Sequence, residues 1–136
     1  MLVDQGMEIL SEEACRELLA GGTVGRIAVS LAAMPAIFPV NYQVVGGDVV
    51  FLTGEGIKAN AAIAGNVVGF EVDEFDPANR TGWSVLLVGR ARLVTEDERA
   101  AMGELNLSPW AGGVKSLLVR IHPEFVSGRR IPGHLS

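Results

Sequence analysis

Residues 35–58 read PAIFPVNYQVVGGDVVFLTGEGIK, and this stretch decides the fold of the chain. Two runs of apolar and β-branched residues, 36–44 and 49–53, flank the tetrapeptide VGGD at 45–48. A Gly-Gly pair between two such runs is typical of a β-hairpin, because glycine accepts the positive φ angles of the turn. The stretch therefore predicts a two-stranded ribbon. Pro39 cannot donate a ladder hydrogen bond, which places its strand at an edge or a bulge of the sheet.

The loop that follows the ribbon could hold a phosphate. It reads TGEGIK at 53–58 and leads into the helix-prone residues 59–64. A strand, a glycine-bearing loop and a helix start bring together backbone N–H groups, the Thr53 hydroxyl and the Lys58 ammonium. The competing interpretation, an ordinary glycine loop with a solvated lysine, stays open because the spacing matches no nucleotide motif.

The rest of the chain predicts short helices and further strands. Ser11 caps a helix that Gly21 and Gly22 stop, with Cys15 as a buried thiol on its inner side. Gly89 predicts a bulge in the longest strand, and Pro123 ends the last strand. The expected elements are strands at 23–31, 36–44, 49–53, 67–73, 84–94 and 115–122, and helices from 58 to 64 and from 95 to about 105.

These elements predict one mostly β domain over residues 1–136. Six strands in runs, separated by only two helical connections, describe a Greek-key-like antiparallel barrel with short flanking helices better than a βαβ sheet. The hydrophobic fraction of 49% and the 17 glycines fit a compact protein with many turns. A positive mean hydropathy indicates apolar surface that a partner covers, and a homodimer is the expectation.

Composition and charge argue against several classes of function. The net charge of −5 argues against a nucleic-acid partner. No window is long and apolar enough for a membrane span, and the first residues lack the features of a signal peptide, so a cytoplasmic location is expected. His122 and His134 lie far apart and predict no metal site, and neither a GxSxG nor a GxGxxG motif occurs. No catalytic residue is assigned.

Three segments resemble the pyridoxamine 5′-phosphate oxidase-like superfamily of flavin-binding split barrels. They are residues 35–58, then VGFEVDEFDPANRTGWSVLLVGRARLV at 68–94, then RIHPEFVSGRR at 120–130. The resemblance extends from about Ser11 to Arg130 in the same order. It implies a homodimeric six-stranded antiparallel split β-barrel that binds FMN at the subunit interface.

The resemblance also implies which residues contact the cofactor. Thr53 is the phosphate hydroxyl and Lys58 the basic phosphate ligand, although the second basic residue of many members is Ala59 here. Arg129, with its neighbour Arg130, lies where the C-terminal segment of the family approaches the site. The residues expected along the flavin are Pro39, Val40, Asn41, Tyr42 and Leu52 from one subunit and Trp83 and Ser84 from its partner.

Three functions follow as hypotheses. The first is an FMN-dependent oxidoreductase that acts on a small molecule; because RRIPGHLS does not reproduce the Arg-x-His pair of true pyridoxamine phosphate oxidases, vitamin B6 oxidation is not expected. The second is a reductase that uses the deazaflavin F420, whose acidic tail needs a groove of Arg90, Arg92, Arg129 and Arg130. The third is a flavin-binding dimer without turnover.

Overall fold

The computed structural model describes residues 3–133 except 5, 55 and 108–116; the side chains of 3, 4, 58 and 63 are also outside the description. Three helices lie in the described part: α1 (Glu12–Gly21), α2 (Ile57–Ile63) and α3 (Glu96–Met102). The described strands are β1 (Val3–Asp4), β2 (Met7–Ile9), β3 (Val24–Leu31), β4 (Met34–Asn41), β5 (Gln43–Val45), β6 (Asp48–Thr53), β7 (Val67–Asp76), β8 (Thr81–Leu93) and β9 (Leu117–Pro132).

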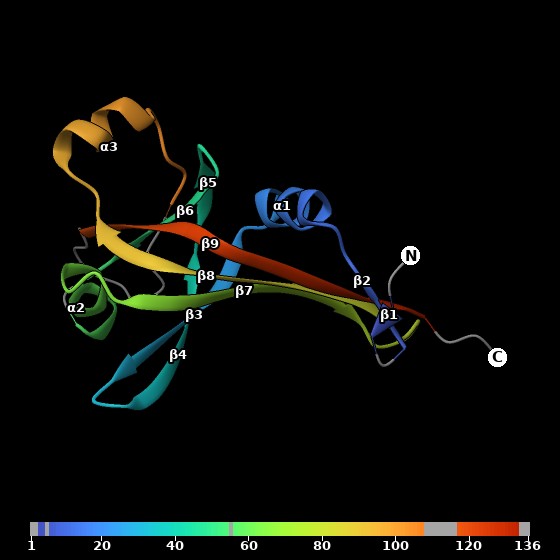
Figure 1. Ribbon diagram of the computed structural model, residues 1–136. Helices are drawn as coiled ribbons and strands as arrows, with labels where there is room; N and C mark the ends of the chain where they lie inside the picture. Colours follow the sequence, from blue (N-terminus) through green and yellow to red (C-terminus); the bar gives the residue numbers. More distant parts are fainter. Residues whose placement is uncertain (1–2, 5, 55, 108–116, 134–136) are drawn as a thin grey trace.

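The strands form one antiparallel sheet that curls into a split barrel (Figure 1). Its order is β1-β2-β9-β8-β7-β3-β4, and β6, paired with β5, joins the first half of β9. The predicted mostly β split barrel is confirmed. The described residues hold three more strands than the predicted six, since β1, β2 and β5 are too short to give a clear alternation of apolar and polar residues.

The predicted hairpin at VGGD is confirmed. Val45 pairs with Asp48, and Gly46 and Gly47 take φ angles of 59° and 86°. The single strand expected at 36–44 is wrong, because the chain leaves the ladder at Tyr42 and forms two strands, β4 and β5. Pro39 lies in β4, which ends the sheet order and pairs with β3 only, so the expected edge position is confirmed.

The long strands β8 and β9 pair along most of their length, with a register shift between Val88 and Gly89. This confirms the predicted bulge at Gly89. Val88 lies opposite Phe125 and Gly89 opposite Pro123, so Glu124 is the extra residue. The expectation that Pro123 ends the last strand is wrong. β9 continues past it, because the bulge interrupts the ladder at the residue that has no N–H to donate.

The helices start where the sequence predicts, and α1 and α2 pack against the sheet. Ser11 caps α1 by accepting a hydrogen bond from the Ala14 N–H (3.1 Å), and Thr95 and Glu98 form the capping box of α3. Cys15 is fully buried on the inner side of α1, as expected. The described part of the chain contains no helix that could span a membrane.

Candidate functional site

The residues expected along the flavin on β4 alternate between two environments. Val40 is buried and faces the core, whereas Pro39 and Asn41 point to the opposite face, which we call the outer face of the sheet. Tyr42 is also buried; its hydroxyl donates to the Leu19 carbonyl, and burial raises its pKa to about 12. The side chains of Val40 and Tyr42 therefore pack as core residues in the single copy.

The predicted phosphate residues follow at the end of β6. Thr53 is buried, and its hydroxyl donates to the Gly54 carbonyl (3.1 Å). Leu52 is half-buried. Gly56 caps α2 with a φ of 142°, which only glycine adopts without strain. Lys58 lies in the first turn of α2, but its side chain is outside the described part, so its role stays a prediction.

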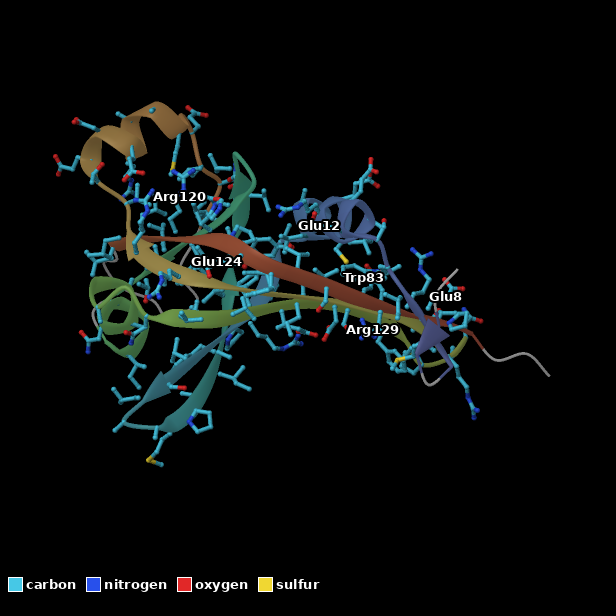
Figure 2. All side chains as sticks on the ribbon, in the orientation of Figure 1. Glu8, Glu12, Trp83, Arg120, Glu124 and Arg129 are labelled. Atoms are coloured by element: carbon cyan, nitrogen blue, oxygen red, sulfur yellow. The ribbon has the colours of Figure 1, made fainter. Side chains whose placement is uncertain are left out.

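A second group of predicted residues lies on β8 and β9. Ser84 is directly opposite Arg129 and belongs to the outer face, whereas Trp83 is opposite Arg130 and points to the inner face that α1 covers. In Figure 2, Trp83 and Arg129 lie toward the end of the sheet where β2 joins it, and Arg120 lies toward the other end. Trp83, Ser84 and Arg129 are thus neighbours in one copy.

The two groups lie at opposite ends of β9. Thr53 is opposite Leu117, near the start of the strand, and Trp83 is opposite Arg130, near its end. These two positions of β9 are thirteen residues apart, which corresponds to about 43 Å at the rise of an extended strand. Thr53 and Trp83 of one copy therefore cannot contact the same small ligand.

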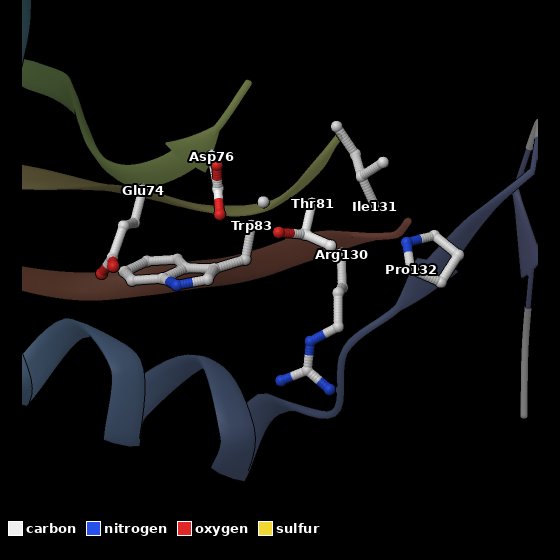
Figure 3. A pocket seen from close by; sticks show the side chains of 8 residues that line it. Glu74, Asp76, Thr81, Trp83, Arg130, Ile131 and Pro132 are labelled. Atoms are coloured by element: carbon white, nitrogen blue, oxygen red, sulfur yellow. The ribbon is translucent and has the colours of Figure 1, made fainter. Parts of the chain in front are cut away.

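Two hollows lie on either side of the second group. The outer one has a volume of about 230 Å³ and is lined by Met7, Phe75, Ser84, Arg129 and other residues. The inner one has a volume of about 210 Å³ and surrounds the Trp83 indole with Glu74, Asp76, Thr81 and Arg130 (Figure 3). The indole lines both hollows, so it separates an apolar outer site from a more polar inner one.

The structure adds three charged residues that the sequence did not point to. Arg26 lies opposite Pro39 on one side and Glu71 on the other, and Asp73 lies opposite Ser84. The Arg26 guanidinium donates to Glu71 (2.9 Å) and Asp73 (3.2 Å). This charged cluster therefore lies on the outer face between Pro39 and Ser84. Alternation alone places each residue on that face, but only the register brings the three together.

The cluster holds a proton near neutral pH. Burial, and then the hydrogen bond with Asp73, raise the pKa of Glu71 to about 7. The hydrogen bond from Glu71 lowers the pKa of Asp73. One carboxyl of the pair therefore carries a proton at a pH where ordinary carboxyls are ionised, and Arg26 balances the remaining charge.

Glu71→Gln is expected to remove a pH dependence of stability. The pKa of Glu71 is raised from 4.5 to about 7 in the folded protein, so the free energy of unfolding falls as pH rises through that window. From pH 5 to pH 8, we expect the free energy of unfolding of the variant to rise by about 1–2 kcal/mol relative to that of the wild type. This figure is discounted for the partial exposure of the side chain. Urea unfolding at both pH values measures this, with the exposed Glu104→Gln as control; parallel pH profiles for Glu71→Gln and wild type would contradict it.

The four arginines considered for an acidic cofactor tail are not gathered in one copy. Arg92 forms an ion pair with Glu98 (2.6 Å), and Arg90 donates to the Gly65 carbonyl (3.0 Å). Arg129 and Arg130 lie near the far end of the sheet and face opposite sides. A single groove of these four side chains is therefore absent from the described part of one copy.

Comparison with known proteins identifies close relatives. The uncharacterized protein Rv0080 of Mycobacterium tuberculosis is 42% identical over 92% of this chain and 85% of its own length. A FAD binding protein of Mycobacterium smegmatis is 38% identical, with a TM-score of 0.75 over 90% of this chain and 98% of its own. A proposed pyridoxamine 5′-phosphate oxidase of Corynebacterium glutamicum is 31% identical, with a TM-score of 0.78 over 98% of this chain and 99% of its own.

The family model described as pyridoxamine 5′-phosphate oxidase matches residues 11–130. The match covers every strand from β3 to β8 and β9 as far as Arg130. With the split barrel and the similar chains above, it shows the family: this protein belongs to the pyridoxamine 5′-phosphate oxidase family.

Proposed function

We propose that two copies of this chain bind flavin between them and use it as an oxidoreductase, with FMN as the expected flavin. The separation of Thr53 from Trp83 along β9 carries this proposal. Both belong to the residues expected around one cofactor, and one copy cannot bring them together. A site that uses both groups takes the first from one copy and the second from its partner, which gives two identical sites per dimer.

The residues present fit a flavin mononucleotide. At the first group, a Cβ added to Gly54 or Gly56 would meet nothing within 4 Å, so a phosphate can approach this backbone beside the Thr53 hydroxyl. At the second group, the outer hollow of about 230 Å³ combines apolar walls with Ser84 and Arg129. It is smaller than a complete small-molecule site, which takes about 300 Å³ or more, as expected if a second copy completes it.

The outer face offers a surface for that second copy. Ile37, Leu86 and Phe125 are 66%, 45% and 73% exposed in the single copy. Ile37, Ala28, Gly69, Val88 and Phe125 are successive cross-strand partners and form one apolar row across β4, β3, β7, β8 and β9. An exposed apolar row of this length is typical of a protein interface.

The chemistry divides between the cofactor and the chain. A bound flavin supplies hydride transfer at its N5 atom. The Ser84 hydroxyl and the Arg129 guanidinium can donate hydrogen bonds to polar groups of a ring in the outer hollow. The Trp83 indole closes one side of that hollow against water. The Glu71 carboxyl, hydrogen-bonded within the cluster next to Ser84, can hold a proton at neutral pH and release it.

The visible spectrum of the purified protein, with the chromophore released by heat and weighed, tests the cofactor. FMN at about one per chain supports the proposal. FAD, the flavin in the name of the M. smegmatis relative, would support a flavin-binding protein with FAD in place of FMN. F420 would favour the second hypothesis. A colourless protein that binds none of them when they are added contradicts it. Turnover with NADH or NADPH separates an enzyme from a flavin-binding dimer.

Lys58→Ala is expected to weaken flavin binding roughly 10- to 150-fold. A charge-assisted hydrogen bond to a phosphate contributes about 1.5–3 kcal/mol, and the variant loses that contact. Fluorescence titration of the flavin-free protein measures the affinity. Lys115→Ala is the matched control, because it removes the other lysine of the chain. Equal affinity of Lys58→Ala and wild type would remove Lys58 from the site.

A further inference from the structure

A third hollow, with a volume of about 450 Å³, lies between the end of α1 and strand β7. Its lining includes Glu17 of α1, Asp73 and Glu74 of β7, and the Trp83 indole. In Figure 3 helix α1 lies across from the Trp83 ring, and the Glu74 carboxylate lies at the edge of that ring. The volume is within the range of small-molecule sites, roughly 300–1,000 Å³.

The charged residues that line this hollow are all carboxylates, and the nearby Arg130 lines the adjoining inner hollow with Glu74 and Trp83. Arg26 balances Asp73 through the ion pair at 3.2 Å. The exposed side chains of Glu17 and Glu74 make no hydrogen bond or ion pair with any described residue. No lysine or arginine is among the described residues that line the hollow. Two carboxylates without a counter-ion therefore face the same space as an indole ring.

The backbone keeps the hollow open. Helix α1 ends at Gly21, where an added Cβ would meet nothing within 4 Å. Gly22 follows in extended conformation and packs against the Tyr42 hydroxyl, which leaves no room for a side chain there. The two glycines form part of the rim, and the side chains that α1 contributes to the lining are those of Glu17 and Leu18.

We propose that this hollow binds an organic cation. An ammonium or quaternary ammonium group is attracted by the face of an indole and by carboxylates, and a hollow of this size admits its alkyl groups. The phosphate of a flavin is repelled by Glu17 and Glu74, so the hollow does not serve the cofactor. Trp83 also lines the outer hollow with Ser84 and Arg129, so the cation lies beside the proposed cofactor position.

The proposal also names a substrate class. If the protein is the flavin oxidoreductase proposed above, its substrate carries a positive charge close to the bond that is oxidised or reduced. This assignment as substrate rests on the proposed function. Binding of the cation does not rest on it, because the hollow is formed by one copy without a cofactor.

Choline and its uncharged carbon analogue 3,3-dimethyl-1-butanol test the proposal with the purified full-length protein by isothermal titration calorimetry. We expect choline to bind and the analogue to bind at least about tenfold more weakly, since only the cation gains from the indole and the carboxylates. Glu74→Gln and Glu17→Gln should each weaken choline binding about three- to tenfold, and Trp83→Leu about tenfold. Glu13→Gln is the matched control, because Glu13 is exposed on the same helix and lies outside the lining.

The outcomes separate this proposal from the proposed function. Absence of choline binding, equal binding of the analogue, or equal weakening by Glu13→Gln overturns the cation site. The flavin content of the same samples is measured independently. A flavin-containing protein that ignores choline overturns the cation site alone. A flavin-free protein that binds choline in the expected manner supports the cation site and removes only its assignment as substrate.

Discussion

Gly89→Ala is expected to destabilise the protein by about 3 kcal/mol, which is at the upper end of the effect of overpacking a buried position. A Cβ at Gly89 would lie 2.0 Å from the His122 carbonyl oxygen and 2.9 Å from its carbonyl carbon. Both contacts are with the backbone of β9, so no side-chain rotation relieves them. The bulge between Val88 and Gly89 must open, and with it the longest strand pair of the sheet.

Gly69→Ala is the matched control for Gly89→Ala. Gly69 lies in a central strand of the same sheet and pairs with Val88, next to the bulge. A Cβ there would meet the Ala28 Cβ at 3.6 Å, an ordinary van der Waals distance. We expect its free energy of unfolding, measured in urea, to stay within a few tenths of a kcal/mol of the wild-type value. Equal midpoints for the two variants would show that the bulge tolerates a side chain.

Pairing two variants that each fail to bind flavin is expected to restore half of the flavin sites in the heterodimer. One chain carries Thr53→Val and Lys58→Ala, the other Ser84→Ala and Arg129→Ala. Each variant alone should bind almost no flavin, because every site has one damaged half. A heterodimer isolated through two different tags has one site with both halves intact and one with both damaged. Its flavin content, measured by absorbance, should be half that of wild type.

A second heterodimer distinguishes a site shared between two copies from a site formed within each copy. A wild-type chain paired with a chain that carries all four substitutions has two sites, each with one damaged half. We expect it to bind almost no flavin, although one of its chains is intact. If each copy instead formed its own site, this heterodimer would retain half of the flavin and the first one would have none. The two arrangements therefore predict opposite results.

The hairpin that contains two glycines could be predicted from the sequence, and the hairpin that contains two alanines could not. Gly46 and Gly47 mark their hairpin because the positive φ angles require residues of this kind. The hairpin between β3 and β4 uses the same angles at Ala32 (49°) and Ala33 (65°), where the sequence gives no signal. Tertiary packing overrides the local preference of alanine there.

The sequence predicts which face of its strand each residue of the candidate site lies on, but it does not predict which residues lie opposite one another. Alternation along β8 separates Trp83 from Ser84, but it does not say which residues of β9 lie opposite them. The distance between Thr53 and Trp83 follows from the pairing of β9 with both β6 and β8, and a hydrophobic pattern carries no information about pairing partners. The raised pKa of Glu71 likewise depends on its burial and then on its hydrogen bond with Asp73, and the alternation along β7 predicts neither.

The extra residue Glu124 changes which residues of β9 face outward: even-numbered residues do so before it and odd-numbered residues after it. Before it, Arg120 and His122 point away from the core; after it, Phe125 and Arg129 do so. Without this shift, Gly128 would lie opposite Ser84 and leave its position against Cys15, and Arg129 would lie opposite Trp83 on the inner face. The single inserted position thus decides which side of the sheet each of the two adjacent arginines faces, so an alignment of relatives that misplaces one gap near Glu124 would exchange a site residue for its neighbour.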